Sequence, residues 1–168
     1  MDFLDLAAGR YSVRRFKTKP VDERHIERIL EAARLAPTAH NYQPQEIIVV
    51  RSEEGLEKLR RCTECHYHAP LAFIISYRRD KAWQREYDGK CSGDVDASIV
   101  TTHMMMEAAS LGLGSTWVMY FIPEAVSCEF ELSDNTVPVA ILLVGEPDMA
   151  PSPNHTKRTD PAEYVSYR

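Results

Sequence analysis

Two clusters of basic side chains stand near opposite ends of the chain. Arg10, Ser12 and Arg14 occupy alternate positions, so an extended segment would point all three to one side. Two guanidinium groups and a hydroxyl on one side suit a phosphate or a carbonyl-rich ring. Lys157 and Arg158 follow a proline-rich stretch near the other end. In a chain with net charge −5, the two clusters predict one shared anionic ligand, with solvated surface charge as the alternative.

A second group of reactive side chains follows a predicted helix: Cys62, Cys65, His66 and His68. The spacing Cys-x-x-Cys-His is that of c-type haem attachment, and two cysteines with two histidines are also zinc ligands. Haem attachment requires export, however, and zinc sites normally join two separated clusters. A helix C-terminus also disfavours a low-pKa redox thiol. We therefore expect unligated side chains, and the alternative is a Cys/His metal- or haem-binding electron-transfer or sensor protein.

The glycines argue against a separate nicotinamide-binding fold. Gly112 and Gly114 follow a predicted helix and lead into a predicted strand. A dinucleotide fingerprint needs the opposite order, from strand to glycine turn to helix, so that the phosphate meets the helix N-terminus. The chain also has no Walker A motif. The sequence therefore disfavours a Rossmann-type site.

Composition limits the class of protein. The 168 residues suit one domain, 1–168, with a sizeable core, since 44% of them are hydrophobic. The acidic balance argues against a nucleic-acid partner, because neutralising phosphates needs a basic face. No apolar run is long enough for a membrane span, and the first residues lack the basic flank and apolar core of a signal peptide. We expect a cytoplasmic protein with reduced cysteines and no membrane partner.

Hydrophobic periodicity predicts alternating helices and strands, hence an α+β or α/β class. The expected helices cover residues 2–9, the stretch between Asp22 and Pro37, the stretch after Ser52, and 94–111; the expected strands cover 47–50, 71–77, 115–118 and 137–144. Residues 37–44 are an expected loop, and the charged residues 78–93 an expected surface excursion. Helix 94–111 is apolar nearly all round, which is typical of a core helix or of one partly covered by another subunit.

Several segments, taken together, resemble the FMN-dependent nitroreductase family. Arg10-Tyr11-Ser12-Val13-Arg14-Arg15-Phe16 is similar to its R-x-S-x-R-x-F segment, and Pro37-Thr38-Ala39-His40-Asn41-Tyr42-Gln43-Pro44 is similar to its A-P-S/T-x-x-N-x-Q-P loop. The further segments that resemble the family are the long helix with Leu111-Gly112-Leu113-Gly114, the strand 138–145, and Lys157-Arg158. These segments cover most of the chain and occur in the family's order.

The resemblance implies an α+β fold, a nitroreductase-like α/β sandwich with a central mixed sheet. It also implies a homodimer, with two FMN molecules at the interface between the subunits. By this analogy Pro37, Thr38 and Asn41 would reach the flavin from the partner subunit. Such a site would be incomplete in one chain.

The resemblance assigns further residues to the cofactor. Arg10 and Ser12 would hold the FMN phosphate and ribityl side, and Arg14 would approach the N1/O2 edge of the flavin. A cation there suits the negative charge that a reduced flavin carries near N1. Met119 and Tyr120 occupy the place where the family's backbone lies close to flavin N5.

The remaining implications concern the phosphate and the reaction. Lys157 and Arg158 would close over the FMN phosphate. Because the flavin performs the hydride chemistry, no catalytic side chain is expected. The resemblance implies NADH or NADPH as a transient donor, and a nitroaromatic, a quinone or a similar small molecule as acceptor. The chain lacks the long insertion after the second strand that shapes the acceptor pocket in many family members.

Overall fold

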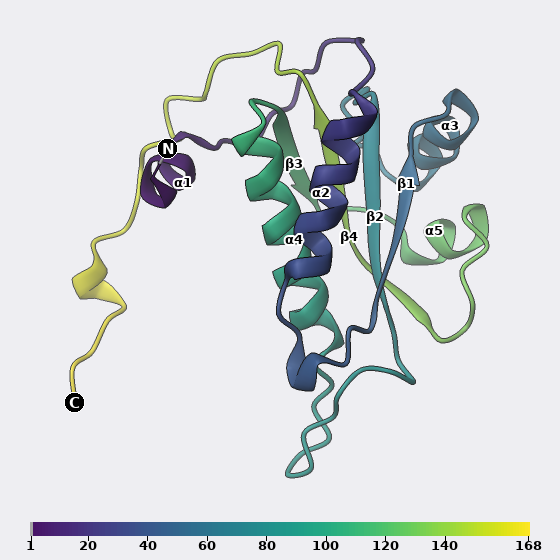
Figure 1. Ribbon diagram of the computed structural model, residues 1–168, viewed down its shortest axis with the longest axis vertical. Helices are drawn as coiled ribbons and strands as arrows, with labels where there is room; N and C mark the ends of the chain where they lie inside the picture. The colour runs from purple at the N-terminus through teal and green to yellow at the C-terminus, as the bar shows by residue number, and fades with distance from the viewer. Residues whose placement is uncertain (1) are drawn as a thin grey trace.

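A computed structural model describes residues 2–168 and builds them around one β-sheet (Figure 1). Within these residues the sheet has four strands in the order β1-β2-β4-β3. The strands are β1 (Gln45–Val50), β2 (Leu71–Arg78), β3 (Gly114–Val118) and β4 (Thr136–Gly145). The two central strands, β2 and β4, are almost wholly buried, which explains their continuous runs of apolar residues.

All three strand pairs are antiparallel, so the expectation of a mixed sheet was wrong. In the described residues the one parallel pairing is an isolated bridge between Ser12 and Ser115. That expectation came from the family resemblance, and a helical connection is compatible with a parallel strand pair. Here α3 (Glu53–Cys62) instead returns the chain to the end of the sheet at which β1 finishes, so that β2 runs back beside it (Figure 1). Strand direction thus depended on where the connecting helix packs.

Helices cover both faces of the sheet, which gives the expected sandwich (Figure 1). On one face, α2 (Glu23–Leu35) and α4 (Gly93–Ser110) bury Ile29 and Met104 against Phe73 of β2. On the other face, α3 and α5 (Pro123–Glu129) bury Leu59 and Val126. The alternation of β2 matches this arrangement, because successive side chains of a strand point to opposite faces. The short helix α5 was not expected from the sequence.

Local signals fix the ends of α2 and α3. The Asp22 side chain accepts a hydrogen bond from the Arg24 N–H, and the Ser52 side chain accepts one from the Gly55 N–H. Both residues are therefore N-caps, and they stand where the sequence predicts that these helices begin. Helix α4 packs against α2 and the sheet along the side that carries Val100 and Met104. The prediction that this helix packs in the core is confirmed, although Val95 on its outer side is half exposed.

Two segments lie away from the body of the molecule (Figure 1). Helix α1 (Phe3–Gly9) buries none of its residues, and Phe3 and Leu4 are exposed. The C-terminal stretch after β4 runs past α1 and includes a short 3-10 turn, Pro161–Glu163. Tyr167 in this stretch is 92% exposed. Among the described residues, no helix is long and apolar enough to cross a membrane.

Candidate functional site

The segment that contains Arg10, Ser12 and Arg14 lies along the start of β3. The Val13 N–H donates to the Ser115 carbonyl at 3.0 Å, and the Thr116 hydroxyl donates to the Val13 carbonyl. A side chain at Gly114 would place its Cβ 2.5 Å from a Val13 methyl group, so only glycine permits this approach. Val13 is buried while its neighbours remain partly or fully accessible. The backbone of the basic segment is thus fixed to the sheet.

The two segments that carry the basic clusters come together in the structure. The Tyr11 hydroxyl donates to the Met149 carbonyl at 2.6 Å. Further along the tail, a His155 ring nitrogen lies 2.8 Å from the Ala8 carbonyl oxygen, and the ring packs edge-on against Tyr11 at 5.8 Å between centroids. These contacts bring His155, two residues before Lys157, beside residues 8–11. Together the two segments form a basic corner, by which we mean Arg10, Arg14, Lys157 and Arg158.

The four cations of this corner have no acidic partner among the residues that the structure describes. Within residues 2–168, Arg10, Arg14, Lys157 and Arg158 make no ion pair with a carboxylate. Most other lysines and arginines do, including Arg15 in the same segment, at 3.1 Å. Unpaired guanidinium and ammonium groups in an acidic chain are a fitting donor set for a phosphate dianion. The corner thus fits the phosphate-bearing ligand that the resemblance implies.

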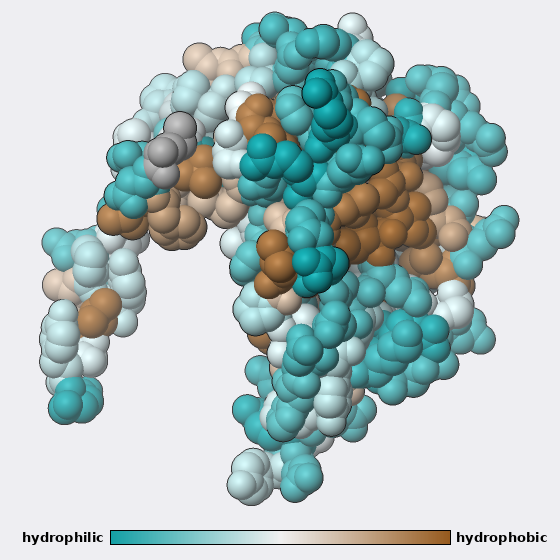
Figure 2. Space-filling model, in the orientation of Figure 1, coloured by the Kyte–Doolittle hydropathy of each residue, from teal (hydrophilic) through white to brown (hydrophobic). Residues whose placement is uncertain are grey.

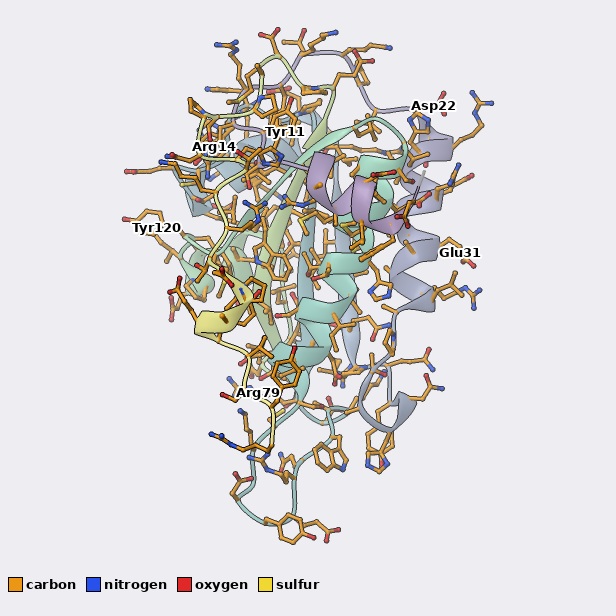
Figure 3. All side chains as sticks on the ribbon, turned by 90° about the vertical axis from the view of Figure 1, so that its left-hand side faces the viewer. Tyr11, Arg14, Asp22, Glu31, Arg79 and Tyr120 are labelled. Carbon is orange, nitrogen blue, oxygen red and sulfur yellow. The ribbon has the colours of Figure 1, made fainter. Side chains whose placement is uncertain are left out.

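Arg14 also borders the Cys62–His68 segment. Its guanidinium lies beside the Tyr67 hydroxyl, which is next to the Cys65 thiol. The hydrogen bond with Cys65 and burial raise the pKa of Tyr67, and the nearby guanidinium opposes that rise. Tyr67 was not among the expected site residues, and its position beside Arg14 depends on the fold. Figure 3 shows Arg14 and Tyr120 on the same side of the molecule.

Met119 and Tyr120, the residues assigned to flavin N5, follow β3 and are exposed. Thr63 fixes their backbone, because its hydroxyl donates to the Tyr120 carbonyl and accepts from the Cys65 N–H at 3.0 Å. A cleft of about 390 Å³ lies here between the end of α3 and residues 120–122. The Cys-x-x-Cys segment thus supports the exposed pair.

The loop with Pro37, Thr38 and Asn41 lies elsewhere. The Ala39 N–H donates to Asp96 in the first turn of α4. Arg10, by contrast, lines a hollow of about 300 Å³ that includes residues 109–113 at the other end of α4. The two places are about 20 Å apart along the helix. Within one chain, the structure separates the predicted loop residues from the basic corner.

In the part of the chain that the structure describes, the cysteine motif does not belong to a cluster that could hold a metal ion. All four cysteines are free in this structure. His66 and His68 pack edge to face with 4.4 Å between ring centroids. Residues 2–168 contain no group of three or more histidine, cysteine or acidic side chains placed to hold a metal ion. Burial raises the pKa of the Cys62 thiol to about 11, so burial disfavours its thiolate in addition to the helix end considered above.

Comparison with known proteins shows similarity along most of the chain. The model of the nitroreductase family matches residues 7–65 and 64–146. A protein of Methanothermobacter thermautotrophicus, provisionally named an NADH dehydrogenase/NAD(P)H nitroreductase, is 31% identical over 159 residues, which cover 88% of this chain and 78% of that protein. The similarity extends beyond the basic segment to almost the whole fold.

Solved structures show the same architecture. A nitroreductase family protein of Clostridium difficile is 44% identical, with a TM-score of 0.95 over 99% of this chain and 98% of its own. A provisionally named nitroreductase of Exiguobacterium sibiricum, solved in complex with FMN, shares the fold at 20% identity, with a TM-score of 0.88 over 100% of this chain and 98% of its own. The chain therefore belongs to the nitroreductase family of oxidoreductases.

Proposed function

We propose that this protein is an FMN-containing, NAD(P)H-dependent oxidoreductase. It passes hydride from NADH or NADPH by way of FMN to a nitroaromatic, a quinone or a similar small acceptor. The observation that carries the proposal is the basic corner, where four cations from both ends of the chain have no carboxylate partner within the described residues. Family membership and the FMN complex of a structural neighbour support it.

The proposal gives each group of residues a task. Arg10, Ser12 and the tail residues Lys157 and Arg158 would bind the phosphate and ribityl side of FMN. Arg14 would face the edge of the flavin that gains negative charge on reduction, because a fixed cation stabilises charge that develops nearby. Met119 and Tyr120 would border the reacting side of the ring. Bound FMN would accept hydride from the nicotinamide and deliver it to the acceptor.

We also propose a homodimer in which each cofactor is shared. Pro37, Thr38 and Asn41 would complete the site of the partner subunit, since α4 separates them from the basic corner of their own chain. Helix α1 and the tail support this assembly, because both leave apolar side chains exposed away from the body. A stable interface of this kind buries more than about 2,000 Å².

A flavin titration tests the cofactor. The purified chain, stripped of flavin, is mixed with FMN or with riboflavin, which lacks the phosphate, and flavin fluorescence is followed. We expect tight binding of FMN, much weaker binding of riboflavin, and oxidation of NADH or NADPH when a quinone is added. Equal affinity for the two flavins would contradict the phosphate role of the basic corner.

Sedimentation tests the assembly. At micromolar concentration the FMN-loaded protein should sediment as a dimer. A stable monomer that retains FMN would remove the shared site from the proposal.

A further inference from the structure

The loop after α2 contains an unusually strained turn. His40, Asn41 and Gln43 have φ angles of 52°, 55° and 50°, in the left-handed region that normally favours glycine. Such conformations persist in non-glycine residues only where the surroundings hold them. Thr38 and Asn41, two of the predicted cofactor contacts, lie in or beside this turn. The shape of the turn therefore needs a structural cause outside its own sequence.

A buried carboxylate supplies that cause. Asp96 is 1% exposed. One of its oxygens accepts the Ala39 N–H at 2.8 Å, and the other accepts the Ser92 hydroxyl at 2.7 Å. Burying a carboxylate is costly unless its oxygens are hydrogen-bonded. Both Asp96 oxygens have a donor, and one of these donors belongs to the strained loop.

Two further contacts hold the turn. The Gln43 N–H donates to the Thr38 hydroxyl at 3.0 Å, which closes the loop on itself. The His40 ring stacks on Trp83, with 5.3 Å between centroids. Trp83 stands at the base of the excursion after β2, where Gln84 and Cys91 form an antiparallel bridge. Among the hydrogen bonds within residues 2–168, the one to Asp96 joins the turn to α4, a helix of the core.

The position of Asp96 in the first turn of α4 has a simpler explanation, which is attraction to the positive end of the helix. Asp94 in the same turn already places a negative charge near the positive end of the helix while remaining exposed to solvent. Moreover, Ser92, the residue before the helix, makes no side-chain capping bond to the helix backbone and donates to Asp96 instead. The dipole alone therefore does not account for a buried carboxylate bound to a loop amide.

We propose that Asp96 is a positioning residue, whose buried carboxylate holds the strained turn 38–43 in the conformation that binds FMN across the dimer. This role rests on the proposed function above. Asp96 itself does not touch the cofactor in this proposal. It acts through the Ala39 amide, and Ser92 orients it.

Three variants and one control test the role. Asp96→Ala removes both acceptors. Asp96→Asn keeps an oxygen for the Ala39 N–H and offers an amide N–H to the Ser92 hydroxyl, so it should restore the geometry. Ser92→Ala removes one donor only. Asp94→Asn removes a charge from the same helical turn at an exposed position and is the matched control.

Two measurements separate positioning from general stability. Hydrogen exchange of residues 37–43 is followed in the flavin-free protein, and the dissociation constant of FMN is measured for the folded protein. Asp96→Ala should speed exchange in the turn and weaken FMN binding at least about tenfold. Ser92→Ala should have a smaller effect in the same direction, while Asp96→Asn and Asp94→Asn should stay within about threefold of the parent.

The outcomes are distinguishable. If Asp96→Ala lowers only the melting temperature and keeps normal FMN affinity, the proposal is wrong. If Asp96→Ala does not fold, Ser92→Ala decides the question, because unchanged exchange and affinity in that variant would overturn it. A parent protein that binds no FMN would instead overturn the proposed function, and this role with it.

Discussion

The two ends of α4 lie beside regions that differ in chemistry: cationic side chains at one end and a strained backbone loop at the other. At its C-terminal end, the segment with Arg10 and Arg14 and the tail place long cationic side chains that have no acidic partner within residues 2–168. At its N-terminal end, the loop around Asn41 has backbone in left-handed conformations and is hydrogen-bonded to the buried carboxylate of Asp96. Figure 2 shows hydrophilic residues over most of this face and an apolar area beside α2, over β1.

This contrast suggests how each end responds to change. Long exposed cations attract an anion but are individually replaceable by water. A strained turn is effective only while several contacts hold it together. We therefore expect FMN binding at the C-terminal end of α4 to depend on charge and salt concentration, and FMN binding at the N-terminal end to depend on packing.

The largest expected effect is at the C-terminal end. Arg10→Ala should weaken FMN binding by about 1.5–3 kcal/mol, the range for a hydrogen bond to a charged group. The matched control is Arg15→Ala, because Arg15 lies in the same segment but is already paired with Asp148 at 3.1 Å. Fluorescence titration measures both affinities. Equal losses in the two variants would mean that general charge, and not the unpaired position, attracts the cofactor.

A packing change tests the other end. Trp83→Ala removes the ring that stacks on His40 and should weaken FMN binding by about 1 kcal/mol, as is typical of an aromatic pair. Tyr87→Ala, in the same excursion but 97% exposed, is the control and should leave affinity unchanged. Raising the salt concentration should not alter the size of the Trp83 effect. A strong salt dependence of that effect would contradict the proposal that packing, and not charge, determines FMN binding at this end.

The tail should contribute less than Arg10. Lys157→Ala should weaken FMN binding by about 1 kcal/mol or less, because exposed ion pairs are worth little and a flexible ammonium is readily replaced by water. High salt should reduce the difference between this variant and the parent. If Lys157→Ala and Arg10→Ala both keep full flavin content after dialysis, the basic corner is solvated charge.

The smallest effect is expected for the cysteines. Cys62→Ser with Cys65→Ser should leave flavin content unchanged and quinone-dependent NAD(P)H oxidation within a few-fold of the parent. The Cys62 thiol should resist thiol reagents near neutral pH and gain reactivity only as the pH approaches its pKa of about 11, because the thiolate is the reactive form. Rapid labelling of Cys62 at neutral pH, or loss of activity with flavin still bound, would contradict this.

Much of the fold was predictable because its signals are local. Asp22 and Ser52 cap helices through contacts within a few residues. The apolar runs of β2 and β4 indicated buried strands. The antiparallel order of the sheet was not predictable, because a helical connection leaves strand direction undecided until the helix packs.

The candidate site divides in the same way. The alternation of Arg10, Ser12 and Arg14 was visible in the sequence, whereas Tyr67 beside Arg14 was not. Asp96 carried no signal either, since an acidic residue in a first helical turn is ordinarily explained by the helix dipole. Its function in the loop became visible only from its burial and its bond to Ala39.

The sequence by itself determined the helix caps, the buried strands, the acidic balance and the presence of two basic clusters. These features follow from side-chain chemistry and short-range periodicity. Only the tertiary structure decided that the two clusters meet, that α4 separates them from the loop with Thr38 and Asn41, and that this loop is strained. Those features depend on contacts between residues far apart in the chain, such as the hydrogen bond from the Ala39 N–H of the left-handed turn to the buried carboxylate of Asp96.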